Sequence, residues 1–133
     1  MADKLHFDLV SPEARVFSGE VDMVVVPGSE GYFGVLPGHA PFMSTIRTGS
    51  IEVHADGKVS RTFIHGGFAE VTPAGLTILA EEAVALESAD AGAIRERLEA
   101  ARLEARDAGD DAARALAETE VEKLEALLAA LAH

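Results

Sequence analysis

The five histidines are the side chains of this chain best suited to acid–base chemistry or metal binding near neutral pH. They are scattered along the sequence as His6, His39, His54, His65 and His133, without the close spacing of zinc ligands. His39, between a glycine and an Ala-Pro pair, could act as a base or a metal ligand. We favour the simpler interpretation that its ring forms a hydrogen bond that shapes a loop.

The patterns of nucleophilic and phosphate chemistry are missing from the sequence. It contains no cysteine and no G-x-S-x-G elbow. Gly28, Gly31 and Gly34 are spaced G-x-x-G-x-x-G, unlike a dinucleotide fingerprint, and no G-K-[ST] occurs. The sequence also contains two adjacent acid pairs, Glu81-Glu82 and Asp110-Asp111. Such pairs occur more often at a solvated strand end or a helix cap than as a catalytic dyad. We expect no catalytic, nucleotide-binding or metal-binding residues, no cofactor and no enzyme activity.

The segment from Gly28 to Pro41 carries four glycines and two prolines in fourteen residues. That density disfavours a long helix or a regular strand, so we expect a tight loop between two strands. Loops that a rigid scaffold holds in place often carry binding residues.

Composition limits the classes of partner. The net charge of −12 disfavours nucleic-acid binding and opposes adsorption to an anionic membrane. No apolar run approaches the roughly 20 residues that a membrane span needs, so we expect no direct lipid insertion. The chain has no cysteine and its N-terminus lacks the apolar region of a signal peptide. We therefore expect a soluble protein of the cytoplasm.

The chain changes character near Glu87. All five prolines, all six phenylalanines and the single tyrosine precede this point, whereas the last 46 residues hold 15 alanines. We predict a fold that is mainly β with α: an N-terminal β-sandwich domain over residues 1–86 and a C-terminal antiparallel two-helix hairpin over residues 87–133.

Short apolar runs and turn signals predict the strands of the sandwich. Asp56-Gly57 and Pro73-Ala74-Gly75 are predicted turns, and Gly66-Gly67 is predicted to be a bulge or a close backbone approach between two strands. The β-branched run Val21–Val26 suggests a strand buried on both faces. The other predicted strand segments are 6–10, 51–54, 59–64, 68–71 and 76–79.

Caps and apolar stripes predict the helices. Ser88 or Asp90 would begin the first helix, Gly109 would end it, and Asp110 or Asp111 would begin the second. The predicted apolar stripes are Ile94, Leu98, Ala101, Ala105 and Ala108 in the first helix, and Ala117, Val121, Leu124, Leu128 and Leu131 in the second.

Arg95, Arg102 and Arg106 fall on one face of the first predicted helix. Ordinary surface pairing with Glu99 explains much of this face, and a basic stripe aimed at an acidic partner is the functional alternative.

The sandwich-then-helices order and several motifs resemble the epsilon subunit of F-type ATP synthases, of the bacterial type. The resemblance covers residues 5–86 and fades in the helices. The stretches that carry it are 9–13, 17–19, 28–31, 33–41, 66–71 and 76–81.

The resemblance implies a non-catalytic rotor subunit of the central stalk, which links gamma to the c-ring and couples proton translocation to ATP synthesis. Such a protein is peripheral, on the cytoplasmic face of the bacterial inner membrane. The basic face of the first helix would point toward the beta subunits. The loop that would face the c-ring contains Ser29, Glu30, Gly31, Tyr32, Phe33 and His39.

The helices depart from the family pattern. Some members bind ATP through [I/L]-D-x-x-R-A, but here Asp90 is followed by Ala93 at the arginine position, so nucleotide binding is not expected. The second helix carries more acid than base, which predicts at most a weak regulation of ATP hydrolysis.

The alternative function is a free-standing β-sandwich that binds a small ligand. That alternative expects exposed aromatic platforms, yet the chain has one tyrosine and no tryptophan.

Overall fold

The structure is a computed structural model that describes residues 3–13 and 15–132. The chain forms two compact units, Met1–Glu87 and Ser88–His133. His133, one of the five histidines considered above, lies outside the described residues. The predicted fold class, a β-sandwich followed by two helices, is confirmed.

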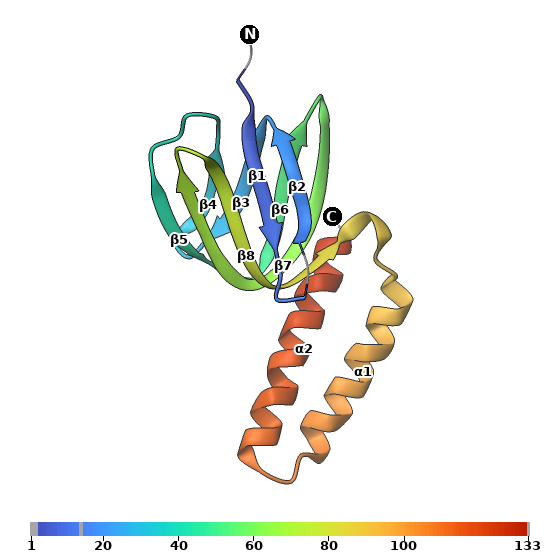
Figure 1. The fold of residues 1–133 in the computed structure, drawn as a ribbon. Helices are drawn as coiled ribbons and strands as arrows, with labels where there is room; N and C mark the ends of the chain where they lie inside the picture. The colour runs from blue at the N-terminus through green and yellow to red at the C-terminus, as the bar shows by residue number, and fades with distance from the viewer. Residues whose placement is uncertain (1–2, 14, 133) are drawn as a thin grey trace. The chain divides into compact units, whose positions relative to one another are not determined.

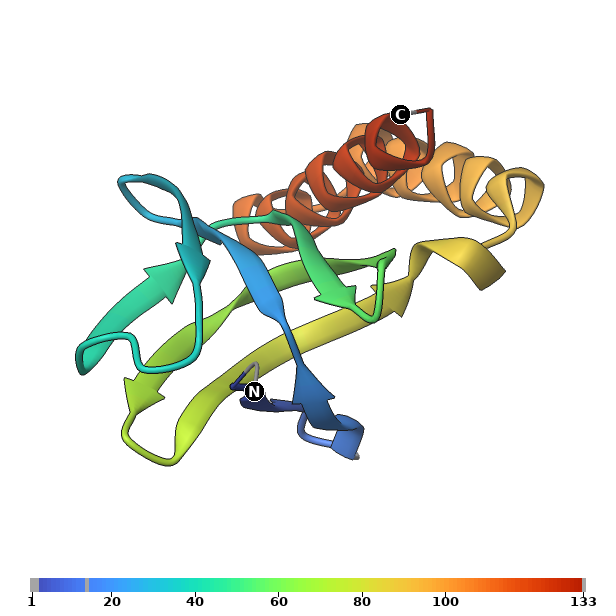
Figure 2. The ribbon, with the colours of Figure 1, turned by 90° about the horizontal axis from the view of Figure 1, so that it is seen from above.

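The first unit is an eight-stranded sheet that curls around a core (Figures 1 and 2). Along the sheet the strands follow the order β2-β1-β8-β7-β5-β3-β4, and β6 pairs with β3 and β7. All these pairs are antiparallel except β1 with β8. The strands are β1 (Leu5–Val10), β2 (Arg15–Val21), β3 (Met23–Gly28), β4 (Gly31–Val35), β5 (Phe42–Ile46), β6 (Gly49–Ala55), β7 (Lys58–Thr72) and β8 (Gly75–Ala85).

Alternating side chains build the core of this unit. Leu5, Phe7 and Leu9 of β1 are buried, whereas the side chains between them lie toward solvent, as the two-residue period of a strand requires. Val21–Val26 is not one strand buried on both faces, which corrects the prediction. Asp22 separates β2 from β3, and only alternate residues of β3 up to Val26 are buried.

Strand β7 continues through Gly66 and Gly67, whereas the sequence predicts a junction between two strands at this glycine pair. Its first part pairs with β6 up to Ile64, and its last part pairs with β5 from Gly67 onward. Both glycines have positive φ angles, +70° and +146°. A Cβ on Gly67 would lie 2.3 Å from the carbonyl oxygen of Leu79 on β8. The predicted close backbone approach is therefore confirmed.

The two predicted turns are also confirmed. Asp56 and Gly57 join β6 to β7 with φ angles of +52° and +78°, as a two-residue hairpin with both central residues at positive φ requires. Pro73 and Ala74 join β7 to β8, and Gly75 opens β8 at φ +140°.

The glycine-rich segment contains a strand, which corrects the prediction of a single loop. Gly31–Val35 forms β4 and pairs along its length with β3. Cross-strand pairing therefore overrides the low strand propensity of Gly31 and Gly34. Only the Ser29-Glu30 turn and the segment 36–41 remain outside strands.

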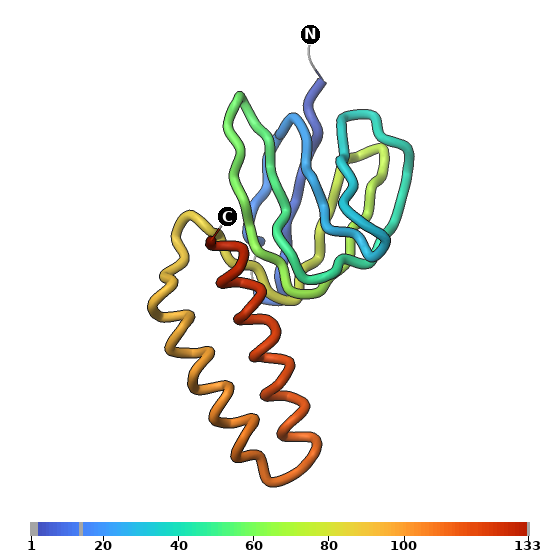
Figure 3. Tube along the Cα trace, turned by 180° about the vertical axis from the view of Figure 1, so that it is seen from behind, coloured from blue at the N-terminus to red at the C-terminus, as the bar shows by residue number. Residues whose placement is uncertain are grey.

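The second unit contains the helices α1 (Ala91–Asp107) and α2 (Asp111–Leu131), preceded by the short 3-10 helix η1 (Leu86–Ser88) (Figure 3). Asp90 caps α1, because its Oδ1 accepts hydrogen bonds from the N–H groups of Gly92 and Ala93. Asp110 caps α2 in the same way through Ala113. The C-cap of α1 is Ala108 in an extended conformation, so the prediction of Gly109 as this cap is wrong.

The buried helix residues match the predicted stripes in part. Ile94, Leu98 and Ala101 are buried in α1, and Ala105 and Ala108 are half-buried. In α2 the buried residues are Ala117, Lys123, Leu124 and Leu127, whereas Val121, Leu128 and Leu131 are half-buried.

Within residues 3–13 and 15–132, no helix combines the length and the apolar character needed to cross a membrane.

A polar cluster joins three corners of the sandwich. The Asp22 carboxylate accepts a hydrogen bond from Lys4 Nζ at 2.5 Å and one from the N–H of Asp56 at 2.8 Å. Lys4 Nζ also lies 3.2 Å from Asp56 Oδ1. The hydrogen bond from Lys4, supported by that from Asp56, lowers the pKa of Asp22.

We predict that Gly67→Ala destabilises the sandwich by about 2 kcal/mol or more, because it combines a strained φ with a clash against backbone. Gly57→Ala is the matched control: its φ is also positive, but nothing lies within 4 Å of the added Cβ. Urea unfolding of both variants gives the comparison. Equal losses of stability would contradict the assigned close approach.

We also predict that Asp22→Asn lowers the Tm at neutral pH. Because the folded state lowers the pKa of Asp22, the stabilisation is present above the unfolded pKa and is lost as the pH falls below about 4. The Tm difference between wild type and variant should therefore shrink on acidification. Asp3→Asn, at an exposed position, is the control for the loss of one negative charge.

Candidate functional site

The first part of the candidate site is the exposed turn between β3 and β4. Ser29 and Glu30 lie between Gly28 and Gly31, which face each other across the hairpin. The turn is held by a hydrogen bond from the N–H of Ser29 to the carbonyl oxygen of Thr45, at 3.1 Å. A Cβ on Gly28 would come within 2.8 Å of the Phe33 ring, so the hairpin is closely packed at its base. The turn therefore presents its two polar side chains from a fixed backbone.

Tyr32 and Phe33 lie on β4 rather than in a loop. Tyr32 is 60% exposed, and the guanidinium carbon of Arg47 lies 5.3 Å from the centre of its ring. Phe33 is half-buried and packs edge-to-face against Phe42, with 5.2 Å between ring centres. Tyr32 is thus available to a partner, whereas Phe33 supports the strand.

His39 lies in the segment that joins β4 to β5. Its Nδ1 is 2.8 Å from the carbonyl oxygen of Ala40, and since a carbonyl only accepts, Nδ1 carries the hydrogen. The N–H of His39 donates to the carbonyl oxygen of Leu36 at 3.1 Å, and Gly38 between them has a φ of +80°. This geometry agrees with a histidine that shapes a loop.

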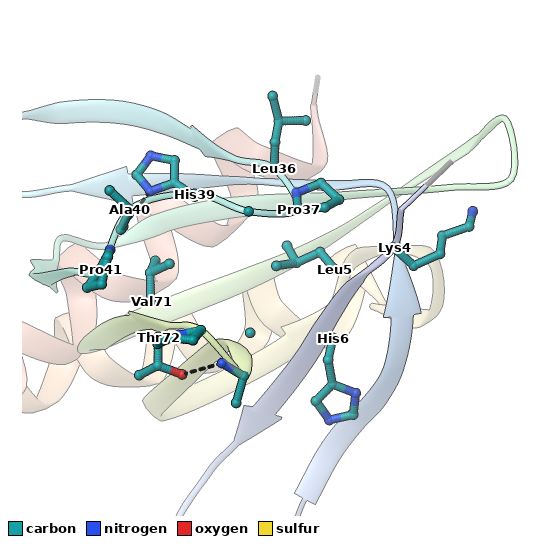
Figure 4. Close-up of a pocket in the computed structure, with 14 residues that line it drawn as sticks. Lys4, Leu5, His6, Leu36, Pro37, His39, Ala40, Pro41, Val71 and Thr72 are labelled. Carbon is teal, nitrogen blue, oxygen red and sulfur yellow. Dashed lines mark hydrogen bonds between the residues drawn. The ribbon is translucent and has the colours of Figure 1, made fainter. Parts of the chain in front are cut away.

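His39 lines a shallow pocket of about 390 Å³ (Figure 4). The walls come from the β4–β5 segment, the β7–β8 turn and the start of β1. Its lining residues are Lys4, Leu5, His6, Leu36, Pro37, Gly38, His39, Ala40, Pro41, Val71, Thr72, Pro73, Ala74 and Gly75. None of them is Phe, Tyr or Trp, so the pocket lacks the aromatic platform expected of a small-ligand site.

The structure does not bring all the predicted contact residues together. Ser29 and Glu30 precede β4, whereas His39 follows it, so the length of a five-residue strand separates them. The expected single loop is therefore two separate surfaces at opposite ends of β4. In the part of the chain that the structure describes, no group of three or more His, Cys, Asp or Glu side chains could hold a metal ion.

The arginines of α1 are mostly engaged in ion pairs. Arg102 pairs with Glu99 at 3.2 Å and with Glu125 of α2 at 3.3 Å. Arg106 lies 3.5 Å from Asp107. Arg95 is exposed. The predicted basic face is therefore partly neutralised by acids of the helical unit itself.

Two similarities identify the family. Residues 4–86 match the family described as "ATP synthase, Delta/Epsilon chain, beta-sandwich domain". The ATP synthase epsilon chain of Maricaulis maris is 62% identical over 133 residues, which is all of both chains. The chain belongs to the ATP synthase epsilon-chain family.

Two further similarities differ in extent. The epsilon chain of Caulobacter vibrioides is 63% identical over 82 residues, which is 61% of the present chain and 94% of that relative. A chain in a cryo-EM structure of the Euglena gracilis mitochondrial ATP synthase, containing OSCP, F1 and the c-ring, superposes with a TM-score of 0.79. It is 32% identical, and the match covers 96% of the present chain and 81% of that chain. The resemblance to the epsilon subunit of F-type ATP synthases, which the sequence motifs indicated, is thus confirmed.

Sequence patterns missed one ionic cluster of the helical unit. Glu120 of α2 lies 3.0 Å from Arg97 of α1 and 2.9 Å from Lys123, which is only 9% exposed. The hydrogen bond from Lys123, followed by that from Arg97, lowers the pKa of Glu120. The i,i+3 spacing of Glu120 and Lys123 was a readable signal, but the contact of Arg97 across the hairpin was not.

Proposed function

We propose that this protein is a non-catalytic rotor subunit of the central stalk, which links gamma to the c-ring and couples proton translocation to ATP synthesis. The main support is its full-length similarity to the Maricaulis epsilon chain. The similarity to a chain of the Euglena F1/c-ring assembly adds support at 32% identity. The alternative of a free-standing ligand-binding sandwich has only the shallow, non-aromatic pocket near His39 in its favour.

The proposed ring contact lies along β4. This strand ends the order of the sheet, so one of its backbone edges has no neighbouring strand among those described. Ser29 and Glu30 at one end, Tyr32 on the strand and His39 at the other end are all exposed. We propose that β4 lies along the polar surface of the ring, because that orientation would let both ends of the strand reach one partner.

The helical unit has a smaller role in this proposal. Arg95, Arg102 and Arg106 would face the beta subunits, but the ion pairs of Arg102 and Arg106 weaken the attraction that they can exert. Asp90 caps α1, and Ala93 offers no charge to a phosphate. We therefore propose weak regulation of hydrolysis, no nucleotide site, and a peripheral location on the cytoplasmic face of the bacterial inner membrane.

Glu30→Lys and His39→Ala should each weaken the coupling of proton flow to ATP synthesis, because both residues belong to the proposed ring contact. The measurement is proton pumping and ATP synthesis in membrane vesicles that contain the assembled variant enzyme. Glu118→Lys, at an exposed position of α2, makes the same charge change elsewhere and should leave coupling intact. Wild-type pumping efficiency in both test variants would contradict the proposed contact.

A chain that ends at Glu87 should fold, assemble and support coupling. The core cluster lies entirely in strands β1 to β8, and the Caulobacter relative has about the length of the sandwich alone. Loss of residues 88–133 should change ATP hydrolysis by about twofold or less, equivalent to under about 0.5 kcal/mol. Cooperative thermal unfolding and co-purification with gamma are the two measurements. A molten sandwich, or one that fails to bind gamma, would contradict the division into a self-sufficient β-sandwich domain and a separate helical domain.

A further inference from the structure

The turn between β6 and β7 contains the one Asp-Gly pair of the sequence, Asp56-Gly57. An aspartate that precedes glycine is prone to form a succinimide, in which the backbone nitrogen of the glycine attacks the aspartate Cγ. Glycine favours this attack because it has no side chain to hinder its own nitrogen and its backbone is permissive. The sequence has no asparagine, so deamidation offers no second route to the same product.

The turn leaves both reacting groups accessible. The side chain of Asp56 is 86% exposed. Nothing lies within 4 Å of the Cβ position of Gly57. The N–H of Gly57 donates no hydrogen bond to any residue that the structure describes, because Gly57 lies at the tip of the hairpin, outside the strand ladder. The attacking nitrogen is therefore adjacent to the carboxyl group and is not shielded by packing.

Two contacts hold Asp56 in place. Lys4 Nζ lies 3.2 Å from Asp56 Oδ1, and the N–H of Asp56 donates to the Asp22 carboxylate at 2.8 Å. Ring closure places the Asp56 Cγ on the nitrogen of Gly57, so the carboxylate must first leave Lys4. Because the ion pair with Lys4 is exposed, it restrains the side chain only weakly. The corner cluster therefore slows the reaction without preventing it.

We propose that Asp56-Gly57 is a site of slow isoaspartate formation in the folded protein, and that Lys4 restrains the rate. The Asp56 carboxylate takes up a proton from water, the Gly57 nitrogen bonds to Cγ and gives up its hydrogen, and one carboxyl oxygen leaves as water. Water then adds to either carbonyl of the succinimide. Opening at Cγ restores aspartate, and opening at the backbone carbonyl gives isoaspartate. Neither step is an oxidation or a reduction, and the inference does not depend on the proposed function.

Isoaspartate at position 56 loosens this corner of the sandwich. The main chain then runs through the Asp56 Cβ, which lengthens a turn that has only two residues between its strands. The pairing of Ala55 with Lys58 that closes the hairpin is disturbed, and the carboxylate moves away from Lys4. We expect the modified fraction to unfold at a lower temperature than the unmodified fraction.

The test incubates the full-length protein at mildly acidic pH, far below the Tm of every variant used. Peptide mapping with electron-transfer fragmentation then locates isoaspartate in the sequence. Wild type should accumulate it at position 56. Asp56→Glu should not form the corresponding isoglutamate, because its longer side chain would have to close a larger and less favourable ring.

Lysine variants test the restraint. Lys4→Met should raise the rate of isoaspartate formation about twofold to fivefold, because the ion pair that it removes is exposed and weak. Lys58→Met is the matched control, since it removes the same charge from the residue that follows the turn, and it should keep the wild-type rate. Lys4→Arg retains the charge beside Asp56 and should also react at the wild-type rate.

Two results would overturn the proposal. Isoaspartate that forms at position 56 only after unfolding in urea, or only at other aspartates, would show that the folded turn is not a modification site. Equal rates in Lys4→Met and Lys58→Met would remove the role assigned to Lys4. Isoaspartate at position 56 of the folded wild type, with faster formation in Lys4→Met alone, supports both parts.

Discussion

The sandwich depends on the ability of β7 to serve two neighbours in succession. The strand leaves β6 at Ile64 and joins β5 at Gly67, and the two glycines between these positions adopt backbone angles that other residues rarely take. The same bend brings the backbone against the carbonyl oxygen of Leu79, so β8 can pair with β7 on both sides of it. Without this bend, β5 and β6 could not both lie beside β7.

Several features of the candidate site follow from that bend. Strand β5 carries Thr45, whose carbonyl oxygen holds the Ser29-Glu30 turn, and Phe42, which packs against Phe33. Strand β6 leads to Asp56, whose N–H binds the Asp22 carboxylate at the corner between β2 and β3. The polar turn and the ionic cluster are therefore positioned by a backbone feature several strands away from them.

Local signals in the sequence predicted the local structure well. The Asp56-Gly57 and Pro73–Gly75 turns and the caps at Asp90 and Asp110 depend on side chains within a few residues, so their chemistry is readable from spacing. Strand β4 was missed because its pairing with β3 outweighs the glycines, and β7 was divided because Gly66-Gly67 resembles a break. The burial of Lys123 and the separation of His39 from Glu30 depend on tertiary arrangement, which no local pattern records.

The pairing of β3 with β4 has a mechanical consequence for a subunit that turns against a neighbour. Five residue pairs connect the two strands, from Val24 with Val35 to Gly28 with Gly31. A pull on the Ser29-Glu30 turn along the strand axis loads the hydrogen bonds of this ladder together, in shear. A pull across the sheet would load them one after another, as in peeling. A tangential load directed along β4 would therefore meet the stiffer response, and the hairpin would transmit torque with little deformation.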